Sequence, residues 1–543
     1  MNPAQVCNLA QLLTHTARLL PHHTALIQGE QRWTWAQIDQ RVDALVAALQ
    51  ALGLQKGDRI LLQCRNNLAM FESAWAAFRM GCVWVPTNFR LAPAEVVYLA
   101  ASSGAKLVLV ESVFAEHAEA VRAASPALQQ VVWIGQPPAS HAAEPTYEAL
   151  VQRHLGAAPA EATVAHDDPL WFFYTSGTTG KPKAAILTHG QMGFVVTNHL
   201  ADLIPGTTER DCSIAVAPLS HGAGIHMLLN VARGAATVLM PGETLDPERF
   251  WQLVEQHRVS NLFTVPTIVK RLVEHDSVDR HDHRSLRYLI YAGAPMYRAD
   301  QKLALQKLGP VLVQYFGLGE VTGCITVLPA DMHSADDDDP NAHIGSCGRP
   351  RTGMEVAVLD AQLQAVPTGS VGEICCRGPA VFAGYHGDPE ATAKALRGGW
   401  FHTGDLGRLD ERGLLYITGR ESDMYISGGS NVYPREVEEV LLSHPGVAEV
   451  AVLGVPDAQW GEAGVAVVVL REGSAALDQA GLLAHLQGRC ARYRWPRQVF
   501  FWDALPKSGY GKIVKKDIRR LLLEQGLIEE IALAPSPVGR GLG

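Results

Sequence analysis

One short stretch combines glycine, hydroxyl and lysine side chains at a density that suits phosphate binding. The run 174–183 reads Tyr-Thr-Ser-Gly-Thr-Thr-Gly-Lys-Pro-Lys, with apolar runs at 170–173 and 184–187. This order predicts a strand, a mobile loop and a second strand. Glycines let backbone N–H groups turn toward a ligand, hydroxyls donate hydrogen bonds, and lysines add positive charge. The spacing is not that of a Walker loop. The hypothesis is therefore a polyphosphate loop of another kind, and the alternative is a flexible surface loop.

The segments around this loop alternate short apolar runs with amphipathic stretches. Strand-like and helix-like runs follow one another at 59–64, 68–80, 83–86, 213–218, 236–240, 247–258 and 261–265. Strand–helix–strand units in series indicate parallel sheets covered by helices. In such sheets ligands bind beyond the carboxyl ends of the strands. After residue 344 short strands and glycine-rich turns indicate a β-rich subdomain, and a compact α+β segment follows residue 420.

Composition narrows the class of protein. A chain of 543 residues is too long for one ordinary core, and 47% hydrophobic with 19% charged residues is typical of a globular enzyme. The net charge of −9 and the lack of a basic block argue against nucleic acid as a partner. Nine cysteines without a C-x-x-C pair are expected to be thiols in a reducing cytoplasm. We expect no signal peptide and no integral membrane segment.

Further motifs follow the loop in a fixed order. They are Ala292-Gly293-Ala294-Pro295, Tyr315-Phe316-Gly317-Leu318-Gly319-Glu320, 399–405, Gly419-Arg420, 427–434 and 506–512. Together with the loop they resemble the adenylate-forming enzymes, which include acyl-CoA synthetases, firefly luciferases and peptide-synthetase adenylation domains. The resemblance extends from about Leu9 to about Leu523.

The resemblance implies an α/β fold with two domains. A large N-terminal domain, 1–419, would contain two helix-covered, mostly parallel sheets and the β-rich subdomain. A hinge at 420–423 centred on Ser422 would lead to a small, mobile α+β lid domain, 424–530. The tail 531–543 is rich in proline and glycine and is expected to be disordered.

The same resemblance assigns residues to ATP and Mg²⁺. Glu320 is the expected Mg²⁺ ligand, because Mg²⁺ prefers one or two carboxylates together with phosphate oxygens. Phe316 offers a flat face to adenine, Asp405 has two oxygens for the ribose hydroxyls, and Arg420 adds a ribose contact. The expected nucleotide-binding set is Thr175, Ser176, Gly177, Thr178, Thr179, Gly180, Lys183, Gly293, Ala294, Pro295, Tyr315, Phe316, Gly317, Asp405 and Arg420.

Two further residues are expected to take part in catalysis. The resemblance makes Lys512 the cation that bridges the attacking carboxylate and the α-phosphate, where it would stabilise charge that grows in the transition state. His221 resembles the histidine that gates the carboxylate pocket, although a lone histidine is more often structural. The acyl pocket is expected to use His221, Gly222, Ala223, His226, Tyr291, Ala292 and Val321. The channel for coenzyme A is expected to use Ser427, Gly428 and Gly429.

Two positions depart from the family pattern. Gly319 stands where the family usually has threonine, which predicts different contacts to the α-phosphate. Ser422 stands at the pivot where lysine or aspartate is common, and hinges do not require one particular side chain.

The predicted function is an ATP-dependent carboxylate–CoA ligase that forms an acyl-AMP intermediate. The pocket composition favours a medium or longer fatty acid, and an aryl carboxylate is the close competitor. The same motifs would also suit a stand-alone adenylation enzyme that loads a carrier protein and, more remotely, a non-catalytic acyl-nucleotide binding protein. The expected partners are the carboxylic acid, ATP and coenzyme A, and a homodimer is left open.

Overall fold

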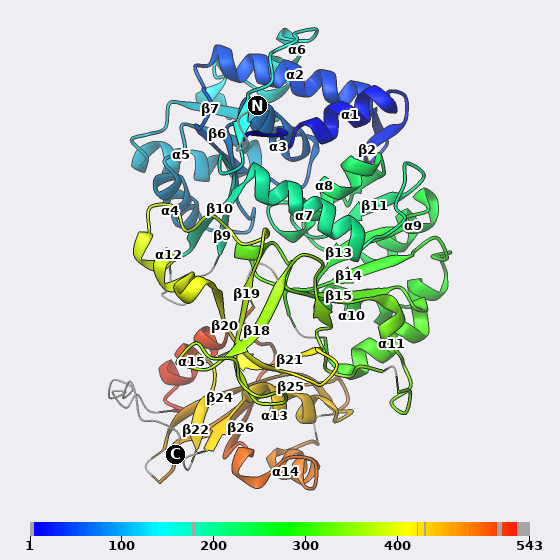
Figure 1. Cartoon of the computed structure of the whole chain (residues 1–543), viewed down its shortest axis with the longest axis vertical. Helices are drawn as coiled ribbons and strands as arrows, with labels where there is room; N and C mark the ends of the chain where they lie inside the picture. The colour runs from blue at the N-terminus through cyan, green and yellow to red at the C-terminus, as the bar shows by residue number, and fades with distance from the viewer. Residues whose placement is uncertain are drawn as a thin grey trace. The chain divides into compact units, whose positions relative to one another are not determined.

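The computed structural model describes residues 5–175, 181–294, 296–340, 342–420, 422–427, 430–457, 459–474, 476–507 and 513–528. These residues form two compact units (Figure 1). The first contains residues 1–370, 374–403 and 409–416, and the second contains 371–373, 404–408 and everything from residue 417. The chain therefore passes several times between the two units. The single hinge predicted at 420–423 stays a prediction.

Two large sheets organise the first unit. The six-stranded sheet has the order β10-β9-β5-β4-β6-β7, in which only β10 runs antiparallel. Its strands are β4 (Arg59–Gln63), β5 (Val83–Pro86), β6 (Leu107–Glu111), β7 (Gln130–Ile134), β9 (Pro169–Thr175) and β10 (Lys183–Thr188). The two predicted strands are confirmed here, since β9 and β10 pair antiparallel, and the loop 176–180 between them lies outside the described residues.

The nine-stranded sheet has the order β17-β16-β15-β14-β13-β11-β12-β2-β3. Its six inner strands are parallel, and β3, β16 and β17 are antiparallel additions at the edges. The strands are β2 (Thr24–Gln28), β3 (Gln31–Thr34), β11 (Cys212–Ala215), β12 (Ala236–Leu239), β13 (Asn261–Thr264), β14 (Tyr288–Tyr291), β15 (Leu312–Phe316), β16 (Thr326–Leu328) and β17 (Arg349–Pro350).

Helices fill the space between these sheets and cover their outer faces (Figure 1). One continuous core joins the inner faces of both sheets to α1 (Gln11–Leu19), α2 (Trp35–Ala51), α3 (Leu68–Met80), α7 (His189–Asp202) and α8 (Gly222–Arg233). A second core packs α9 (Pro247–His257), α10 (Pro266–Glu274) and α11 (Arg298–Leu308) on the nine-stranded sheet. A third packs α4 (Pro93–Ser103) and α5 (Ala115–Ala124) on the six-stranded sheet. The expected helix-covered, mostly parallel architecture is confirmed.

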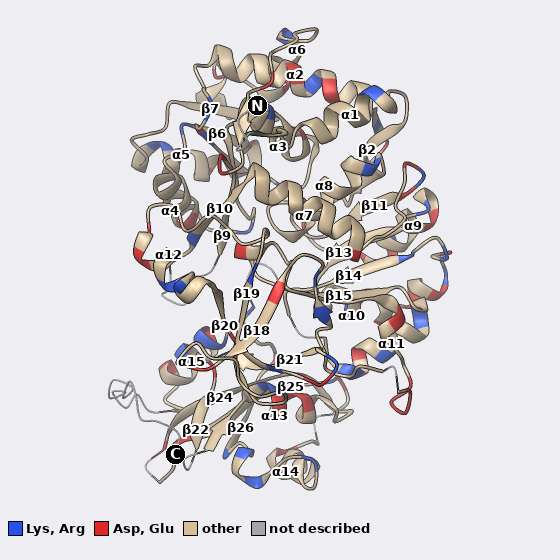
Figure 2. Cartoon of the chain, in the orientation of Figure 1, with Lys and Arg blue, Asp and Glu red and all other residues tan. Residues whose placement is uncertain are grey.

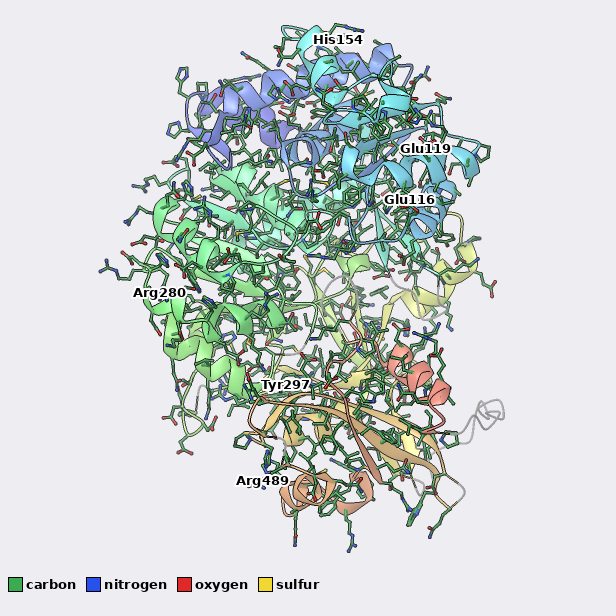
Figure 3. The ribbon with its side chains drawn as sticks, turned by 180° about the vertical axis from the view of Figure 1, so that it is seen from behind. Glu116, Glu119, His154, Arg280, Tyr297 and Arg489 are labelled. Carbon is green, nitrogen blue, oxygen red and sulfur yellow. The ribbon has the colours of Figure 1, made fainter. Side chains whose placement is uncertain are left out.

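The outer helices are amphipathic, as the sequence pattern requires. In α5, Ala118 and Val121 are buried, whereas Glu116 and Glu119, which are labelled in Figure 3, are exposed. Figure 2 marks lysines and arginines in blue and acidic residues in red, and both kinds occur on the helices of the first unit.

The β-rich subdomain contributes a four-stranded sheet in the order β18-β19-β20-β21. Its strands are β18 (Glu355–Leu359), β19 (Gly372–Arg377), β20 (Phe401–Leu409) and β21 (Leu415–Arg420). The helix α12 (Pro389–Ala395) begins at the side-chain cap of Asp388.

The second unit is a small α+β structure. Its sheet has the order β23-β22-β25-β24, with β26 paired to β25. The strands are β22 (Tyr425–Ser427), β23 (Ser430–Val432), β24 (Val447–Asp457), β25 (Gly461–Leu470) and β26 (Gln498–Phe501). One core packs α13 (Pro434–Leu442) and α14 (Gln479–Leu486) on this sheet, and another packs α15 (Lys515–Glu524).

Within the described part of the chain, every helix falls short of the length and apolarity that a membrane-spanning segment requires. All nine cysteines are free thiols, as expected, and the adjacent Cys375 and Cys376 are both buried.

Candidate active site

The carboxylate of Glu320 is held by two hydroxyl groups from distant parts of the chain. Thr175 Oγ1 donates to Glu320 Oε1 at 2.9 Å, and the hydroxyl of Tyr385 donates to the same oxygen at 2.8 Å. Glu320 is 4% exposed. Burial and the neighbouring carboxylate raise the pKa of Tyr385, which therefore remains a neutral donor. Among the described residues Glu320 Oε2 has no hydrogen-bond partner, so one carboxylate oxygen is fixed and the other can bind a cation.

Local backbone pairing explains why these residues meet. Thr175 ends β9, and Glu320 lies in the single turn Gly319–Val321 that follows β15, so both stand beyond the carboxyl ends of parallel strands. The segment 383–386 runs along β10, where Ile186 N–H donates to the Gly384 carbonyl at 2.9 Å and Ala383 N–H donates to the Ile186 carbonyl at 3.1 Å. This pairing holds Tyr385 beside the turn.

Lys183 lies beside the same cluster. It is the cross-strand partner of Thr175 in the β9–β10 hairpin. Its Nζ lies 3.4 Å from the carboxylate of Asp388 and 5.4 Å from the centre of the Tyr385 ring. The Ala391 backbone N–H and then Lys183 lower the pKa of Asp388, so this carboxylate is ionised at neutral pH. A cation at the mouth of the hairpin suits a phosphate.

The departure at Gly319 has a steric explanation. A Cβ at this position would lie 2.6 Å from the ring of Phe173 and 2.7 Å from Cγ2 of Thr175, so the structure leaves no room for a side chain. The same Phe173 ring meets the ring of His221 edge-on, with 4.9 Å between centroids. Phe173 thus occupies the space beside Gly319 and also contacts His221, whose Nδ1 lies 3.1 Å from Ser220 Oγ.

The residues predicted to bind adenine come together at the carboxyl ends of two neighbouring strands of the nine-stranded sheet. Gly293 and Ala294 lie just beyond the end of β14, and Phe316 ends the neighbouring parallel strand β15, with Gly317 immediately after it. Gly293 has φ of +83°, a backbone conformation that favours glycine. Phe316 is half-buried, and Gly317 packs so tightly against Gly323 that a Cβ would overlap its backbone.

Tyr315 points to the opposite face of β15 from Phe316. Its ring stacks on Phe263 with 5.7 Å between centroids and meets His199 edge-on, and burial raises its pKa. The structure therefore places the Tyr315 side chain in the core between the two large sheets, which we call the inner core.

The acyl-side residues divide between two faces of the nine-stranded sheet. Ala223 and His226 on α8 line a small cavity together with Met227 of the same helix, Phe263 of β13 and residues of β11 and β12. Ala292 and Val321 are buried in the same inner core, and a Cβ at Gly222 would lie 2.6 Å from the Phe263 ring.

Tyr291 does not join them. The Tyr291 side chain lies in the outer core, the one that packs α9, α10 and α11 on the nine-stranded sheet. Its hydroxyl lies 3.0 Å from His333 Nε2 and 3.2 Å from Gln314 Oε1. Strand alternation explains the difference, because Ile290 and Ala292 face inward and Tyr291 between them faces outward.

In the second unit Asp405 and Arg420 form an ion pair at 3.1 Å. Asp405 lies in β20 and is buried, while Arg420 ends β21 with its side chain 49% exposed. Ser422 is exposed and donates to Asp423 at 3.3 Å, and Ser427 is buried where β22 meets β25.

Several predicted residues lie outside the described ones. They are Ser176, Gly177, Thr178, Thr179, Gly180, Pro295, Gly428, Gly429 and Lys512, together with Glu421 of the hinge and the tail beyond residue 528.

Sequence reasoning missed Tyr385, Asp388 and Phe173. Tyr385 and Asp388 stand in a turn-rich segment far along the chain from the phosphate loop, and only the pairing with β10 brings them to it. Phe173 lies in the apolar run before the loop, where it resembles ordinary core. The glycine at position 319, where the family usually has threonine, was the one sign in the sequence that a neighbouring side chain such as Phe173 fills this space.

Comparison with known proteins agrees with this geometry. The family model described as "AMP-binding enzyme" matches residues 13–386, and the one described as "AMP-binding enzyme C-terminal domain" matches residues 436–512. The chain is 38% identical over 509 residues to a feruloyl-CoA synthase from Amycolatopsis sp. The aligned region covers 93% of this chain and 97% of that protein. It is 33% identical over 518 residues to the long-chain-fatty-acid–CoA ligase FadD13 of Mycobacterium tuberculosis, covering 94% and 98%. The solved structure of ATP-bound MatB from Rhodopseudomonas palustris superposes with a TM-score of 0.83 at 28% identity, covering 94% of this chain and 99% of that one.

Proposed function

The chain belongs to the AMP-binding enzyme family, and we propose that it joins an aromatic carboxylic acid to coenzyme A. As an AMP-forming acid–thiol ligase, it uses ATP to activate the acid. In the first half-reaction a carboxylate oxygen attacks the α-phosphorus of ATP, the α–β anhydride bond breaks, and pyrophosphate leaves. In the second, the thiolate of coenzyme A attacks the acyl carbon and AMP leaves.

The observation that carries the proposal is the fixed carboxylate of Glu320. Its Oε1 accepts hydrogen bonds from Thr175 and Tyr385, and this orients the carboxylate beside Lys183 at the mouth of the β9–β10 hairpin. A buried carboxylate with one oxygen left over suits Mg²⁺, which supplies charge that offsets the phosphates when it is bound with ATP. We propose that Glu320 holds the metal and Thr175 and Lys183 the departing phosphates, with the loop residues 176–180 completing the site.

The remaining roles extend the same proposal. Gly293, Ala294, Phe316 and Gly317 would bind adenine at their shared sheet edge. Asp405 would accept the ribose hydroxyls beside Arg420. Lys512 would stabilise the charge that develops as the acyl adenylate forms, and Ser427 with the following glycines would border the channel for coenzyme A. The lid would turn about 420–423. The nine free thiols support a cytoplasmic location.

The identity of the carboxylic acid is a separate part of the proposal. Relatives include both a feruloyl-CoA synthase and a long-chain-fatty-acid–CoA ligase. The cavity beside α8 has a volume of about 10 Å³, and its lining includes the polar side chains of Ser213, His226 and Thr237. The feruloyl-CoA synthase is 38% identical to this chain and the fatty-acid ligase 33%, which favours an aromatic acid over the fatty acid that composition suggested.

A panel of acids tests the proposal. Purified protein is offered benzoic, cinnamic and indole-type acids, and saturated fatty acids of increasing length, with MgATP. Pyrophosphate release and thioester formation are measured with and without coenzyme A. We expect coenzyme A thioesters of aromatic acids. Pyrophosphate release without thioester formation would favour an enzyme that loads a carrier protein, preference for long saturated acids would favour a fatty-acid ligase, and no release with any acid would favour a non-catalytic binding protein.

A further inference from the structure

The cavity beside α8 has room for little more than one small polar group. Its volume of about 10 Å³ is close to the least that can hold a water molecule. Ala223, His226 and Met227 line it from the helix, Thr237 and Ala215 from the sheet, and Phe263 closes a further side. The walls are therefore mostly apolar, with three polar side chains, Ser213, His226 and Thr237, set among them.

Two of these polar side chains, His226 and Thr237, carry an atom without a hydrogen-bond partner. His226 is 5% exposed and Thr237 is 2% exposed. Within the described part of the chain, nothing bonds to Nδ1 of His226 or to Oγ1 of Thr237. A buried polar atom left unpaired costs on the order of 1–3 kcal/mol. Two such atoms on the walls of one cavity indicate a site that a ligand completes.

The hydrogen-bonding character of these atoms can be assigned. His226 Nε2 lies 2.7 Å from Asn261 Oδ1, an oxygen that can only accept, so the ring carries its proton on Nε2. Burial lowers the pKa of His226 to about 4, so the ring is neutral at physiological pH. Nδ1 is therefore an acceptor. The Thr237 hydroxyl can donate, since Oγ1 has no other acceptor to satisfy.

One acceptor and one donor that line the same small space match a hydroxyl group. We infer that this cavity receives a hydroxyl on the far end of the substrate acid, which donates to His226 Nδ1 and accepts from Thr237 Oγ1. The inference rests on the proposed function and names its substrate class, an aromatic acid with a phenolic hydroxyl opposite the carboxylate. An ether oxygen could only accept, and a methyl group would leave both atoms unpaired.

Matched pairs of acids test this inference. The 4-hydroxy and 4-methyl forms of benzoic acid and of cinnamic acid are nearly the same size within each pair, and the two parents differ in length. We expect kcat/KM for thioester formation to favour the hydroxy form of at least one pair by about tenfold or more, because a site built to bond a hydroxyl discriminates against the analogue without it.

Two substitutions test the residues. Thr237→Val keeps the shape and removes the hydroxyl, and His226→Gln keeps a donor that can reach Asn261 and removes Nδ1. Each is expected to bring the hydroxy-to-methyl ratio within about threefold. Thr264→Val is the matched control, because Thr264 Oγ1 is also buried and unpaired but does not line the cavity. It should leave the ratio unchanged.

The outcomes separate this inference from the proposed function. Equal use of both members of each pair by the wild-type protein would overturn the hydroxyl site, as would a ratio that survives Thr237→Val, and either result would leave the ligase activity standing. If His226→Gln does not fold, as judged by thermal melting, the nearly isosteric Thr237→Val decides the matter. Failure to form any thioester would instead refute the proposed function.

Discussion

Tyr385 donates a 2.8 Å hydrogen bond to Oε1 of Glu320, the oxygen that also accepts from Thr175. A tyrosine from the β-rich subdomain thus helps to orient the proposed metal ligand. Replacement of Tyr385 by phenylalanine removes the bond and keeps the ring beside Lys183. We expect the KM for MgATP to rise about tenfold or more, since a hydrogen bond to a charged group contributes roughly 1.5–3 kcal/mol.

The control for that experiment is Tyr174→Phe. Tyr174 precedes Thr175 but points to the opposite face of β9, where its hydroxyl lies 2.7 Å from Ser102 Oγ and 3.2 Å from the Leu99 carbonyl. The KM for MgATP should be unaffected. Equal effects of the two variants on pyrophosphate release would contradict the role given to Tyr385.

Gly319 and Phe173 are expected to be energetically coupled. A Cβ at 319 would come within 2.6 Å of the Phe173 ring, so Gly319→Ala forces the ring to move. Overpacking of this kind costs about 1–3 kcal/mol of unfolding free energy. Phe173→Leu makes room, and the double variant should recover roughly 1 kcal/mol or more relative to the sum of the single changes. Chemical denaturation of the four proteins measures the cycle, and simple additivity would disprove the steric account.

His189 predicts a loss of stability in mild acid. Burial lowers its pKa from 6.5 to about 4, and its Nδ1 accepts the Leu9 N–H at 3.2 Å. The unfolded state binds a proton below pH 6.5 that the folded state binds only near pH 4. The stability from this residue is therefore complete above about pH 6.5 and is lost as the pH falls to about 4. The full shift corresponds to on the order of 3 kcal/mol.

Thermal melting between pH 7 and pH 4.5 checks this effect. His189→Asn keeps an acceptor for Leu9 and removes the titration, so its melting temperature should fall less steeply with pH than that of the wild type. His22→Asn, at an exposed histidine, should follow the wild-type curve. Parallel curves for all three proteins would show that His189 is not responsible.

Lys512→Ala should separate the half-reactions. We expect at least a hundredfold slower formation of acyl-AMP, on the scale of about 2.7–4 kcal/mol for one charge-stabilising donor. Conversion of supplied acyl-AMP and coenzyme A into thioester should be nearly normal. Lys507→Ala is the control in the same unit, since Lys507 pairs with Glu449 at 2.5 Å. Equal loss of both half-reactions in Lys512→Ala would refute alternation by the lid.

The sequence predicted what depends on local pattern. Periodicity placed the helix 68–80 within α3 and the strand 59–64 on β4, and motif order placed Glu320 and Thr175 after strands, where the structure brings them into contact. Packing between distant segments could not be predicted. Tyr385 reaches Glu320 only because 383–386 pairs with β10, and Tyr291 faces the outer core because of its position in the alternation of β14.

The polar atoms of the acyl-side cavity could not be predicted from pattern alone. The small residues around Ala223 indicated only room for an acyl tail, and the two unpaired polar atoms are visible only when α8 is packed against β12. His226 was already a candidate for the acyl pocket, whereas Thr237 lies in a run of residues that resembles an ordinary buried strand.

The first turn of α8 restricts which substitutions can change the acid specificity of such an enzyme. A Cβ at Gly224 would overlap the Leu219 carbonyl, and a Cβ at Gly222 would press into the Phe263 ring, so these two positions have almost no mutational freedom. Ala223, His226 and Met227 instead share the cavity wall. Natural or laboratory diversification of specificity along this helix must therefore concentrate on those three codons, and a library confined to them would sample most of what α8 can contribute.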